Sequence, residues 1–173
     1  VNTDFGSKVL SASTGVLLNN EMDDFSNANA ANYYGLHPSY FNYPEPGKRP
    51  LSSMSPTILL SDRGAVRLVG GASGGPRIIT ATVQVLLNYM IRGIDNILES
   101  LKFPRLHSQL LPETVYVEEH ELVSGLTIRT GQETFAALKK RGHNVTAWEH
   151  SMGVSQYIAV DPDSQMMTGA SDP

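Results

Sequence analysis

A run of glycines between a predicted strand and a predicted helix limits the fold of this chain more than any other feature. Residues 65–69 form a short, mostly apolar alternating segment, the glycines begin at Gly70, and apolar residues at helical spacing run from Ile78 to Ile91. Pro76 occupies the position where a proline is favoured in the first turn of a helix. The sequence therefore predicts a strand, a glycine turn and a buried helix in succession.

Two interpretations of the glycine turn remain open from these residues alone. In the first, the backbone N–H groups of Gly74 and Gly75 lie at the positive end of the helix dipole and hold an anion, either a permanent one or the transient oxyanion of a carbonyl group under attack. In the second, which fits most glycine clusters before helices, the glycines only permit a tight turn and close packing. A nucleotide phosphate is disfavoured because no P-loop lysine and serine follow Gly75.

Composition excludes several classes of protein. The 173 residues are 40% hydrophobic with a formal net charge of −4, and lysine and arginine are scattered, so a nucleic-acid partner is not expected. No apolar run reaches the length of a membrane span, and the absence of cysteine removes disulfides and thiolate chemistry. We expect one domain over residues 1–173, truncated at both ends, because the sequence starts without methionine and stops without a closing element.

Three carboxylates fall within four residues at Glu21, Asp23 and Asp24. Their mutual repulsion is costly unless a positive charge lies nearby. One interpretation is a pocket for an ammonium group. The other is a solvated acidic turn, which is the usual structure of such clusters.

Paired hydroxyl groups follow a long predicted loop. Residues 26–50 are rich in asparagine, proline, glycine and tyrosine without a sustained period, and the aromatic side chains favour an ordered flap. The loop leads to Ser52 and Ser53, just before the apolar strand predicted at 58–60. Serine hydroxyls at such a place can donate to a carboxylate, although serines also fill turns for local hydrogen-bonding reasons.

The remainder of the chain predicts a layered α+β domain, because strands, helices and further strands follow one another in that order. His107 and His120 lack the paired spacing of a metal site, so no metal is expected. Periodicity and turn residues predict the other elements, which are strands at 15–18, 112–118 and 153–160, a hairpin at 58–69, a helix at 94–101, and a helix opened by a capping box at 130–133.

Several segments taken together point to one protein family. In chain order they are Asn2, 17–25 (LLNNEMDDF), 47–56 (GKRPLSSMSP), 73–75 (SGG), 161–162 (DP) and 169–173 (GASDP). On these motifs the chain closely resembles the small subunit of γ-glutamyltransferase, also called glutathione hydrolase, almost from end to end.

The resemblance implies an α+β fold, the four-layer αββα sandwich of the N-terminal-nucleophile hydrolases, incomplete in this chain. It also implies a heterodimer formed by self-cleavage of one precursor, with the large subunit as partner, no cofactor, and a location outside the cytosol, at the cell surface or in the periplasm or vacuole. In that family a threonine at the new N-terminus attacks the γ-amide carbonyl of glutathione or another γ-glutamyl compound, with its own amine as base. The γ-glutamyl group then passes to water, an amino acid or a dipeptide.

Matched position by position, the resemblance implies roles for individual residues, while Asp23 receives none. Those implied to hold the α-ammonium group of the substrate are Asn2, Glu21 and Asp24, those implied to hold its α-carboxylate are Ser52 and Ser53, and those implied to form the oxyanion hole are Gly74 and Gly75.

The chain departs from the family pattern at its start. The family's small subunit begins with the nucleophilic threonine and a strand, and this sequence begins beyond both. Thr3 is no substitute, because it follows Asn2 within a binding segment. The arginine that completes the family's carboxylate pocket belongs to the large subunit. We therefore expect no turnover from residues 1–173 alone, and the alternative is a truncated, inactive paralogue that binds a γ-glutamyl compound or another protein.

Overall fold

The computed structural model describes residues 5–92, 94 and 96–173, which form two compact units. The first unit is Val1–Ser52 and the second is Ser53–Pro173. Asn2, to which the resemblance gives a binding role, lies outside the described residues. Among the described residues, no helix combines the length and hydrophobicity needed to cross a bilayer.

The first unit is built mainly from loops and turns. In the part of this unit that the structure describes, the helical pieces are two 3₁₀ helices, Glu21–Asp24 and Tyr40–Asn42. The strand predicted at 15–18 is wrong, because this segment forms no regular ladder: Leu17 makes an isolated antiparallel bridge with Leu10, and Leu18 donates to the carbonyl of Val9 beside it. Its apolar run is too short to form a ladder, and Val16 and Leu18 are left exposed.

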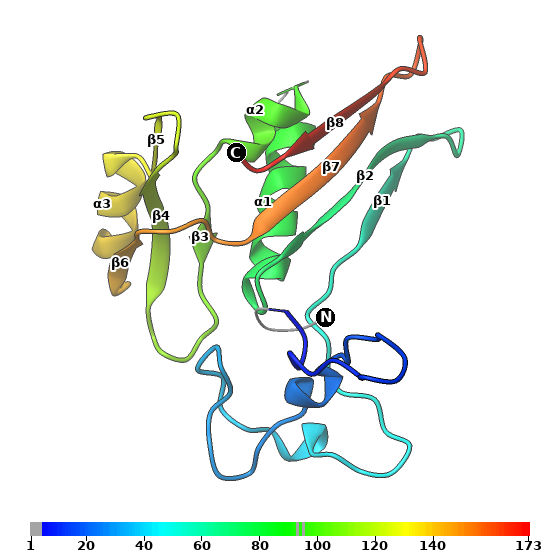
Figure 1. Ribbon diagram of the computed structural model, residues 1–173. Coiled ribbons are helices and arrows are strands. Elements are labelled where there is room, and N and C mark those ends of the chain that lie inside the picture. The colour runs from blue at the N-terminus through cyan, green and yellow to red at the C-terminus, as the bar shows by residue number, and fades with distance from the viewer. Residues whose placement is uncertain (1–4, 93, 95) are drawn as a thin grey trace. The chain divides into compact units, whose positions relative to one another are not determined.

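The second unit contains an antiparallel sheet of four strands (Figure 1). In spatial order the strands are β1 (Thr57–Leu60), β2 (Val66–Ser73), β7 (Val154–Val160) and β8 (Met167–Ser171). The predicted hairpin is confirmed, and its register pairs Thr57 with Gly70. The strand predicted at 153–160 is likewise confirmed as β7.

Two helices pack on this sheet. They are α1 (Arg77–Ile91), as predicted from its periodicity, and α2 (Ile97–Leu101), which begins later than the predicted residue 94. Asn96 caps α2 by accepting a hydrogen bond from the N–H of Leu98 at 2.9 Å, and this cap fixes where the helix starts. The core between helices and sheet is formed by Leu68, Val85, Ile97, Leu101, Tyr157 and Ala159.

Gly70 and Gly71 belong to β2, so the turn is shorter than the glycine run predicts. Gly70 is needed inside the strand because it lies opposite Tyr157 of β7. A Cβ atom at Gly70 would lie 2.1 Å from Cδ1 of the Tyr157 ring. The close approach of this ring therefore explains the glycine, and the turn itself begins at Gly74.

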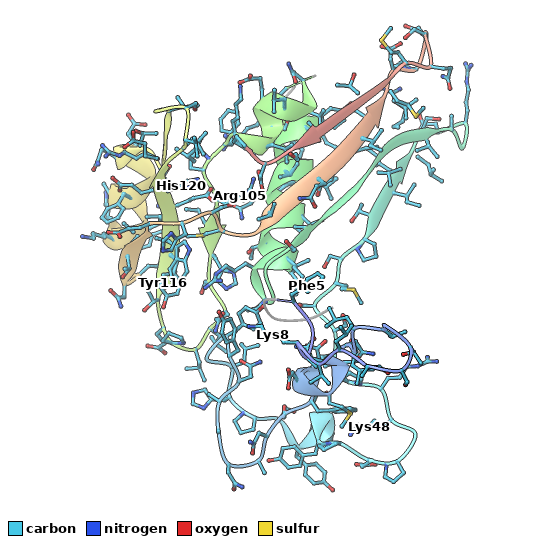
Figure 2. The ribbon with its side chains drawn as sticks, viewed as in Figure 1. Phe5, Lys8, Lys48, Arg105, Tyr116 and His120 are labelled. Atoms are coloured by element: carbon cyan, nitrogen blue, oxygen red, sulfur yellow. The ribbon has the colours of Figure 1, made fainter. Side chains whose placement is uncertain are left out.

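A second sheet lies in the same unit, with Tyr116 and His120 along its central strand β4 (Val115–Glu121) (Figure 2). The strand β6 (Val145–Trp148), which pairs with β4 in parallel, was not expected, because the sequence around Trp148 has too little alternation to indicate a strand. The predicted capping box at 130–133 is wrong, since Gly131 is the N-cap and Thr130 donates to the carbonyl of Glu118 instead. The elements are β3 (Leu106–His107), β4 (Val115–Glu121), β5 (Thr127–Arg129), α3 (Gln132–Lys140) and β6 (Val145–Trp148).

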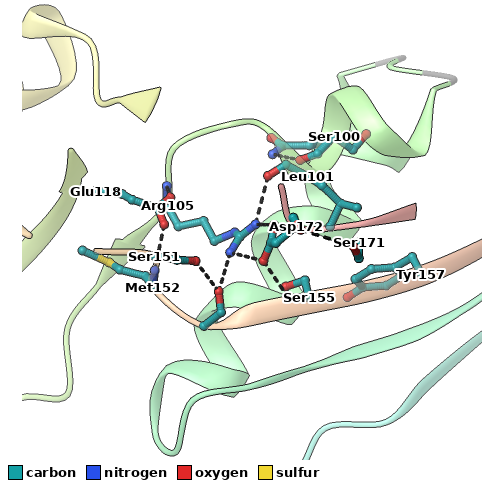
Figure 3. A network of polar contacts seen from close by, with 12 residues as sticks. Ser100, Leu101, Arg105, Glu118, Ser151, Met152, Ser155, Tyr157, Ser171 and Asp172 are labelled. Atoms are coloured by element: carbon teal, nitrogen blue, oxygen red, sulfur yellow. Dashed lines mark hydrogen bonds and ion pairs between the residues drawn. The ribbon is translucent and has the colours of Figure 1, made fainter. Parts of the chain in front are cut away.

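A buried ion pair joins the two sheets (Figure 3). Arg105, just before β3, pairs with Asp172, just after β8, and its Nη1 atom lies 2.8 Å from Asp172 Oδ2. The same guanidinium donates to the carbonyl oxygens of Gly153 at 3.0 Å and Leu101 at 2.9 Å. Glu118 accepts from the N–H of Arg105 at 2.9 Å. Both charged side chains are nearly inaccessible to solvent, and these hydrogen bonds offset the free-energy cost of removing the two charges from water.

Candidate functional site

Glu21, Asp23 and Asp24 lie on one tight turn of the first unit. The 3₁₀ helix Glu21–Asp24 closes through a hydrogen bond from the N–H of Asp23 to the carbonyl of Asn20 at 2.9 Å. The buried side chain of Asn20 also donates to Asp23 Oδ2 at 2.9 Å. Asp23 therefore has a structural role in holding the turn, which accounts for the carboxylate to which the resemblance gave no function.

Asn42 connects this acidic turn to the segment that precedes Ser52. Its side-chain amide donates to the carbonyl oxygen of Asp24 at 2.8 Å, and its side-chain oxygen accepts from the N–H of Leu51 at 2.8 Å. Its main-chain carbonyl accepts from the N–H of Ser26 at 3.0 Å. Asn42 therefore holds the two ends of the predicted flap together. Asn42 was not anticipated, because a single asparagine in an Asn-rich loop gives no distinguishing signal.

The glycine turn of the second unit lies at the start of α1, as predicted. Gly74 and Gly75 have φ angles of 130° and 61°, and Pro76 is the N-cap of the helix with φ of −62°. Among the described residues, the N–H groups of Gly74 and Gly75 have no hydrogen-bond acceptor. Two backbone donors at the positive end of a 15-residue helix are thus available to an anion.

Ser53 lies beside this turn and touches it. Its Oγ donates to the carbonyl oxygen of Gly75 at 2.9 Å. Of the predicted site residues, the structure thus brings Ser53, Gly74 and Gly75 together within the second unit. Glu21, Asp24 and Ser52 belong to the first unit, and their meeting with the second group in one pocket stays a prediction.

The back of the glycine turn is closed by Gly153. A Cβ atom on Gly74 would lie 2.9 Å from the Cα of Gly153, and one on Gly153 would lie 2.9 Å from the carbonyl oxygen of Ser73. The carbonyl oxygen of Gly153 accepts hydrogen bonds from Arg105 and, at 2.6 Å, from Ser151. The buried ion pair therefore also fixes the backbone against which the turn is packed.

Polar side chains of α1 connect its first turns to the second sheet. Thr80 Oγ1 lies 2.9 Å from His107 Nδ1, and Gln109 Oε1 lies 3.0 Å from His107 Nε2. Burial lowers the pKa of His107, more than the hydrogen bond to Gln109 raises it, and the positive charge of Arg77 lowers it further. Arg77 itself stacks over the ring of Trp148, with its Cζ atom 4.3 Å from the ring centroid.

No cluster of at least three His, Cys, Asp or Glu side chains that could hold a metal ion is found within residues 5–92, 94 and 96–173. Within the second unit, the backbone N–H groups of Gly74 and Gly75 can hold a developing negative charge.

Comparison with known proteins gives a consistent result. The family model described as gamma-glutamyltranspeptidase matches residues 1–173. The glutathione hydrolase proenzyme of Escherichia coli (strain K12) is 42% identical over 174 residues, which cover 100% of this chain and 28% of the relative. The glutathione hydrolase proenzyme 1 of Schizosaccharomyces pombe is 40% identical over 172 residues, which cover 99% of this chain and 26% of the relative. The chain thus spans about a quarter of the length of these curated relatives.

A solved structure can be superimposed on almost the whole of this chain. A mutant gamma-glutamyltranspeptidase of Helicobacter pylori superimposes with a TM-score of 0.84 at 38% identity, covering 99% of this chain and 88% of that chain. The antiparallel sheet, the second, mixed sheet and their helices are thus the expected, incomplete α+β sandwich of the N-terminal-nucleophile hydrolases.

Proposed function

Because this chain belongs to the gamma-glutamyltranspeptidase family, we propose that it is the part of a glutathione hydrolase that binds the γ-glutamyl group and stabilises the oxyanion formed during its transfer. The substrates proposed are glutathione and other γ-glutamyl amides. The acceptors proposed are water, amino acids and dipeptides.

The proposed reaction passes through a γ-glutamyl acyl-enzyme. A threonine hydroxyl of the complete protein, deprotonated by its own α-amine, attacks the γ-carbonyl carbon, and the negative charge moves to the carbonyl oxygen. The N–H groups of Gly74 and Gly75 would hold that oxygen, each donor being worth about 3 kcal/mol in comparable sites. The C–N bond then breaks, the leaving amine takes the proton, and water or an amine acceptor later releases the γ-glutamyl group.

The observation that carries the proposal is the glycine turn at the start of α1. Its two backbone donors are without an acceptor among the described residues, and a serine hydroxyl lies against the turn. An enzyme that transfers acyl groups needs such preorganised donors where the oxyanion develops. The acidic turn supports the same proposal, because Glu21 and Asp24 are placed on one turn suited to an ammonium group, with Ser52 proposed to bind the α-carboxylate.

The proposed partner is the remainder of the same precursor, as the large subunit. One face of the β1-β2-β7-β8 sheet is covered by α1, whereas the opposite face presents Ile58, Val69 and Ile158 side by side in register. These side chains are 64%, 38% and 46% exposed, which is unusual for a contiguous apolar row. A further sheet packed on this row would complete the four-layer sandwich.

The test is hydrolysis of a chromogenic γ-glutamyl anilide by the full-length protein. Glu21→Gln and Asp24→Asn each remove a charged partner of the substrate ammonium, so each is expected to lower kcat/KM about 10- to 100-fold. The matched control is Glu45→Gln, at an exposed carboxylate of the same unit that pairs with Lys48 at 3.5 Å. No hydrolysis by the unaltered protein, or equal rates for Asp24→Asn and Glu45→Gln, would reject the proposal.

A further inference from the structure

A β-bulge near the start of β2 sets the position of Arg67. Leu59 pairs with Leu68 and Leu60 pairs with Val66, which leaves Arg67 without a pairing partner on β1. Such bulges turn a side chain away from the regular alternation of a strand. Arg67 is among the residues that line a cavity of about 600 Å³, which we call the Arg67 cavity. The bulge therefore supplies this cavity with a guanidinium group.

The Arg67 cavity has the size and part of the lining of a small-molecule pocket. Its volume lies within the usual range for such pockets. The apolar residues Ile97, Ala159 and Pro162 form part of its wall. Ile97 and Ala159 also belong to the buried core, so tight packing keeps this part of the wall in place. The cavity thus presents a fixed apolar surface together with a cation.

The guanidinium group of Arg67 has a hydrogen-bond donor that the protein does not use. Its Nε atom is buried and has no acceptor among the described residues. Buried donors without an acceptor are rare in native proteins, because the donor has lost its water and gained no other partner. A carboxylate in the cavity would supply the acceptor, since its two oxygens match the parallel N–H groups of a guanidinium.

Neutral residues that can donate hydrogen bonds line the cavity as well. They are Tyr89 near the end of α1, Asn96 before α2, and Thr168 of β8. The Oδ1 atom of Asn96 accepts from the N–H of Leu98 at 2.9 Å, and its Nδ2 atom takes no part in this cap. These residues add donors for the oxygens of a bound carboxylate.

A negative charge lines the same cavity. Asp161, which directly follows β7, uses its Oδ1 atom to accept from the N–H of Asp163 at 3.1 Å and from the N–H and Oγ of Ser164 at 2.7 and 2.8 Å. The hydrogen bonds from Ser164 lower the pKa of Asp161, and the positive charge of Arg67 lowers it further, so this carboxylate is ionised at neutral pH. Its Oδ2 atom takes part in none of these three bonds.

Opposite charges in one cavity select the type of ligand. A simple anion would be attracted by Arg67 and repelled by Asp161, and a simple cation would meet the reverse. A zwitterion carries both charges and satisfies both residues. In a free α-amino acid the two charged groups are bonded to the same carbon atom, and its side chain is left to contact the apolar wall.

We propose that the Arg67 cavity is a binding site for a free α-amino acid with an apolar side chain, whose α-carboxylate pairs with Arg67 and whose α-ammonium group pairs with Asp161. Arg67 and the glycine turn lie at opposite ends of β2 (Val66–Ser73), roughly 20 Å apart at the usual rise of a strand. One amino acid therefore cannot contact both. The site is one that the proposed function does not use.

The test is a titration of the full-length protein with L-leucine, followed by NMR of isoleucine methyl groups. Ile97 lines the cavity, so bound leucine is expected to shift its δ1-methyl resonance, while Ile58, on the opposite face of the sheet, supplies the control resonance. Arg67→Gln is expected to raise the leucine concentration at half-saturation at least about 10-fold, because charge-assisted hydrogen bonds are lost. Arg63→Gln, at an exposed arginine of the turn before β2, is expected to leave it unchanged.

A second variant and two analogues test the ammonium and carboxylate contacts separately. Asp161→Asn keeps the Oδ1 acceptor of the turn and removes the charge, so it is expected to weaken leucine binding at least about 10-fold without disturbing the fold. 4-Methylpentanoate lacks the ammonium group and leucinamide lacks the carboxylate, and each is expected to bind at least about 10-fold more weakly than leucine.

Three results would overturn the inference. The first is an Ile97 resonance that does not move up to the solubility limit of leucine, as expected if the remainder of the precursor fills the cavity. The second is equal half-saturation for Arg67→Gln and Arg63→Gln. The third is equal binding of leucine and 4-methylpentanoate, which would make the cavity a site for simple carboxylates. The titration involves no hydrolysis, so its outcome is independent of the proposed function.

Discussion

The side-chain amide of Asn42 donates a 2.8 Å hydrogen bond to the main-chain carbonyl oxygen of Asp24. The other side of the same amide accepts from the N–H of Leu51 at 2.8 Å. One side chain thus fixes the backbone of the proposed ammonium site and that of the residue next to Ser52. Within the first unit, Asn42 therefore sets the distance between the proposed ammonium site and the segment that leads to Ser52.

Replacing Asn42 should weaken substrate binding more than it slows the chemical step. Asn42→Ala removes both hydrogen bonds, each worth about 1 kcal/mol, so KM for a γ-glutamyl anilide is expected to rise about 10-fold or more with a smaller change in kcat. Asn29→Ala is the matched control, since Asn29 is an exposed asparagine of the same loop. Equal KM values for the two variants in steady-state kinetics would contradict the role given to Asn42.

Alanine at Gly70 should destabilise the protein strongly. The added Cβ would lie 2.1 Å from Cδ1 and 2.5 Å from Cγ of Tyr157, and neither the ring nor the paired strand can move away without breaking the ladder. The expected loss in free energy of unfolding is about 3 kcal/mol, as for other overpacked cores. Gly169→Ala, also in the sheet but facing open space, should change it by about 0.5 kcal/mol or less. Urea unfolding of the full-length protein measures both, and similar midpoints would show that the ring does not constrain Gly70.

Loss of Asp172 should be costly because it leaves the guanidinium of Arg105 buried without a counterion. The side chains are 3% and 6% exposed for Arg105 and Asp172. Asp172→Ala is therefore expected to lower the free energy of unfolding by about 3 to 5 kcal/mol. The exposed pair of Glu99 and Lys102, at 2.8 Å, supplies the control, and Glu99→Ala should cost about 1 kcal/mol at most. Denaturant unfolding that ranks the two variants equally would be the contrary result.

Acidification should destabilise the protein through His107. Its side chain is 3% exposed, and burial lowers its pKa below the ordinary value of 6.5. At pH values between 6.5 and the lowered pKa, the unfolded chain binds a proton at this histidine and the folded chain does not. The contribution of neutral His107 to the free energy of unfolding is therefore complete above pH 6.5 and is lost as the pH falls below that value. Urea midpoints of the full-length protein between pH 7.5 and 5.5 should therefore fall less steeply for His107→Gln than for the unaltered protein. His37→Gln, at an exposed histidine, should keep the original slope, and parallel slopes for all three would contradict the assignment.

Elements with a strong local signal are predicted well from the sequence. The helix at residues 77–91 has apolar residues at helical spacing, and the hairpin at 57–73 has turn residues between two apolar strands. The glycine turn and the acidic turn follow from composition over a few residues. These features depend on neighbours in the chain, which a sequence displays directly.

Features that depend on distant partners are not predicted. The sequence predicts that Gly70 is a turn residue, and only the structure shows that it pairs with Tyr157 inside a strand. The strand β6 is stabilised by parallel pairing with β4, which is also a distant partner. Asn42 matters only because Asp24 and Leu51 converge on it. The contact of Ser53 with the glycine turn is not predicted either, because the register of β1 and β2 shifts between Leu59 and Leu60 and only the structure shows this shift.

The most direct test of the central claim is a crystal structure of the full-length protein with glutamate bound. We expect its α-ammonium group within about 3 Å of the carboxylates of Glu21 and Asp24, and a γ-carboxylate oxygen within about 3 Å of the N–H groups of Gly74 and Gly75. Glutamate bound away from these residues, or an acidic turn and a glycine turn that open into separate cavities, would contradict the account.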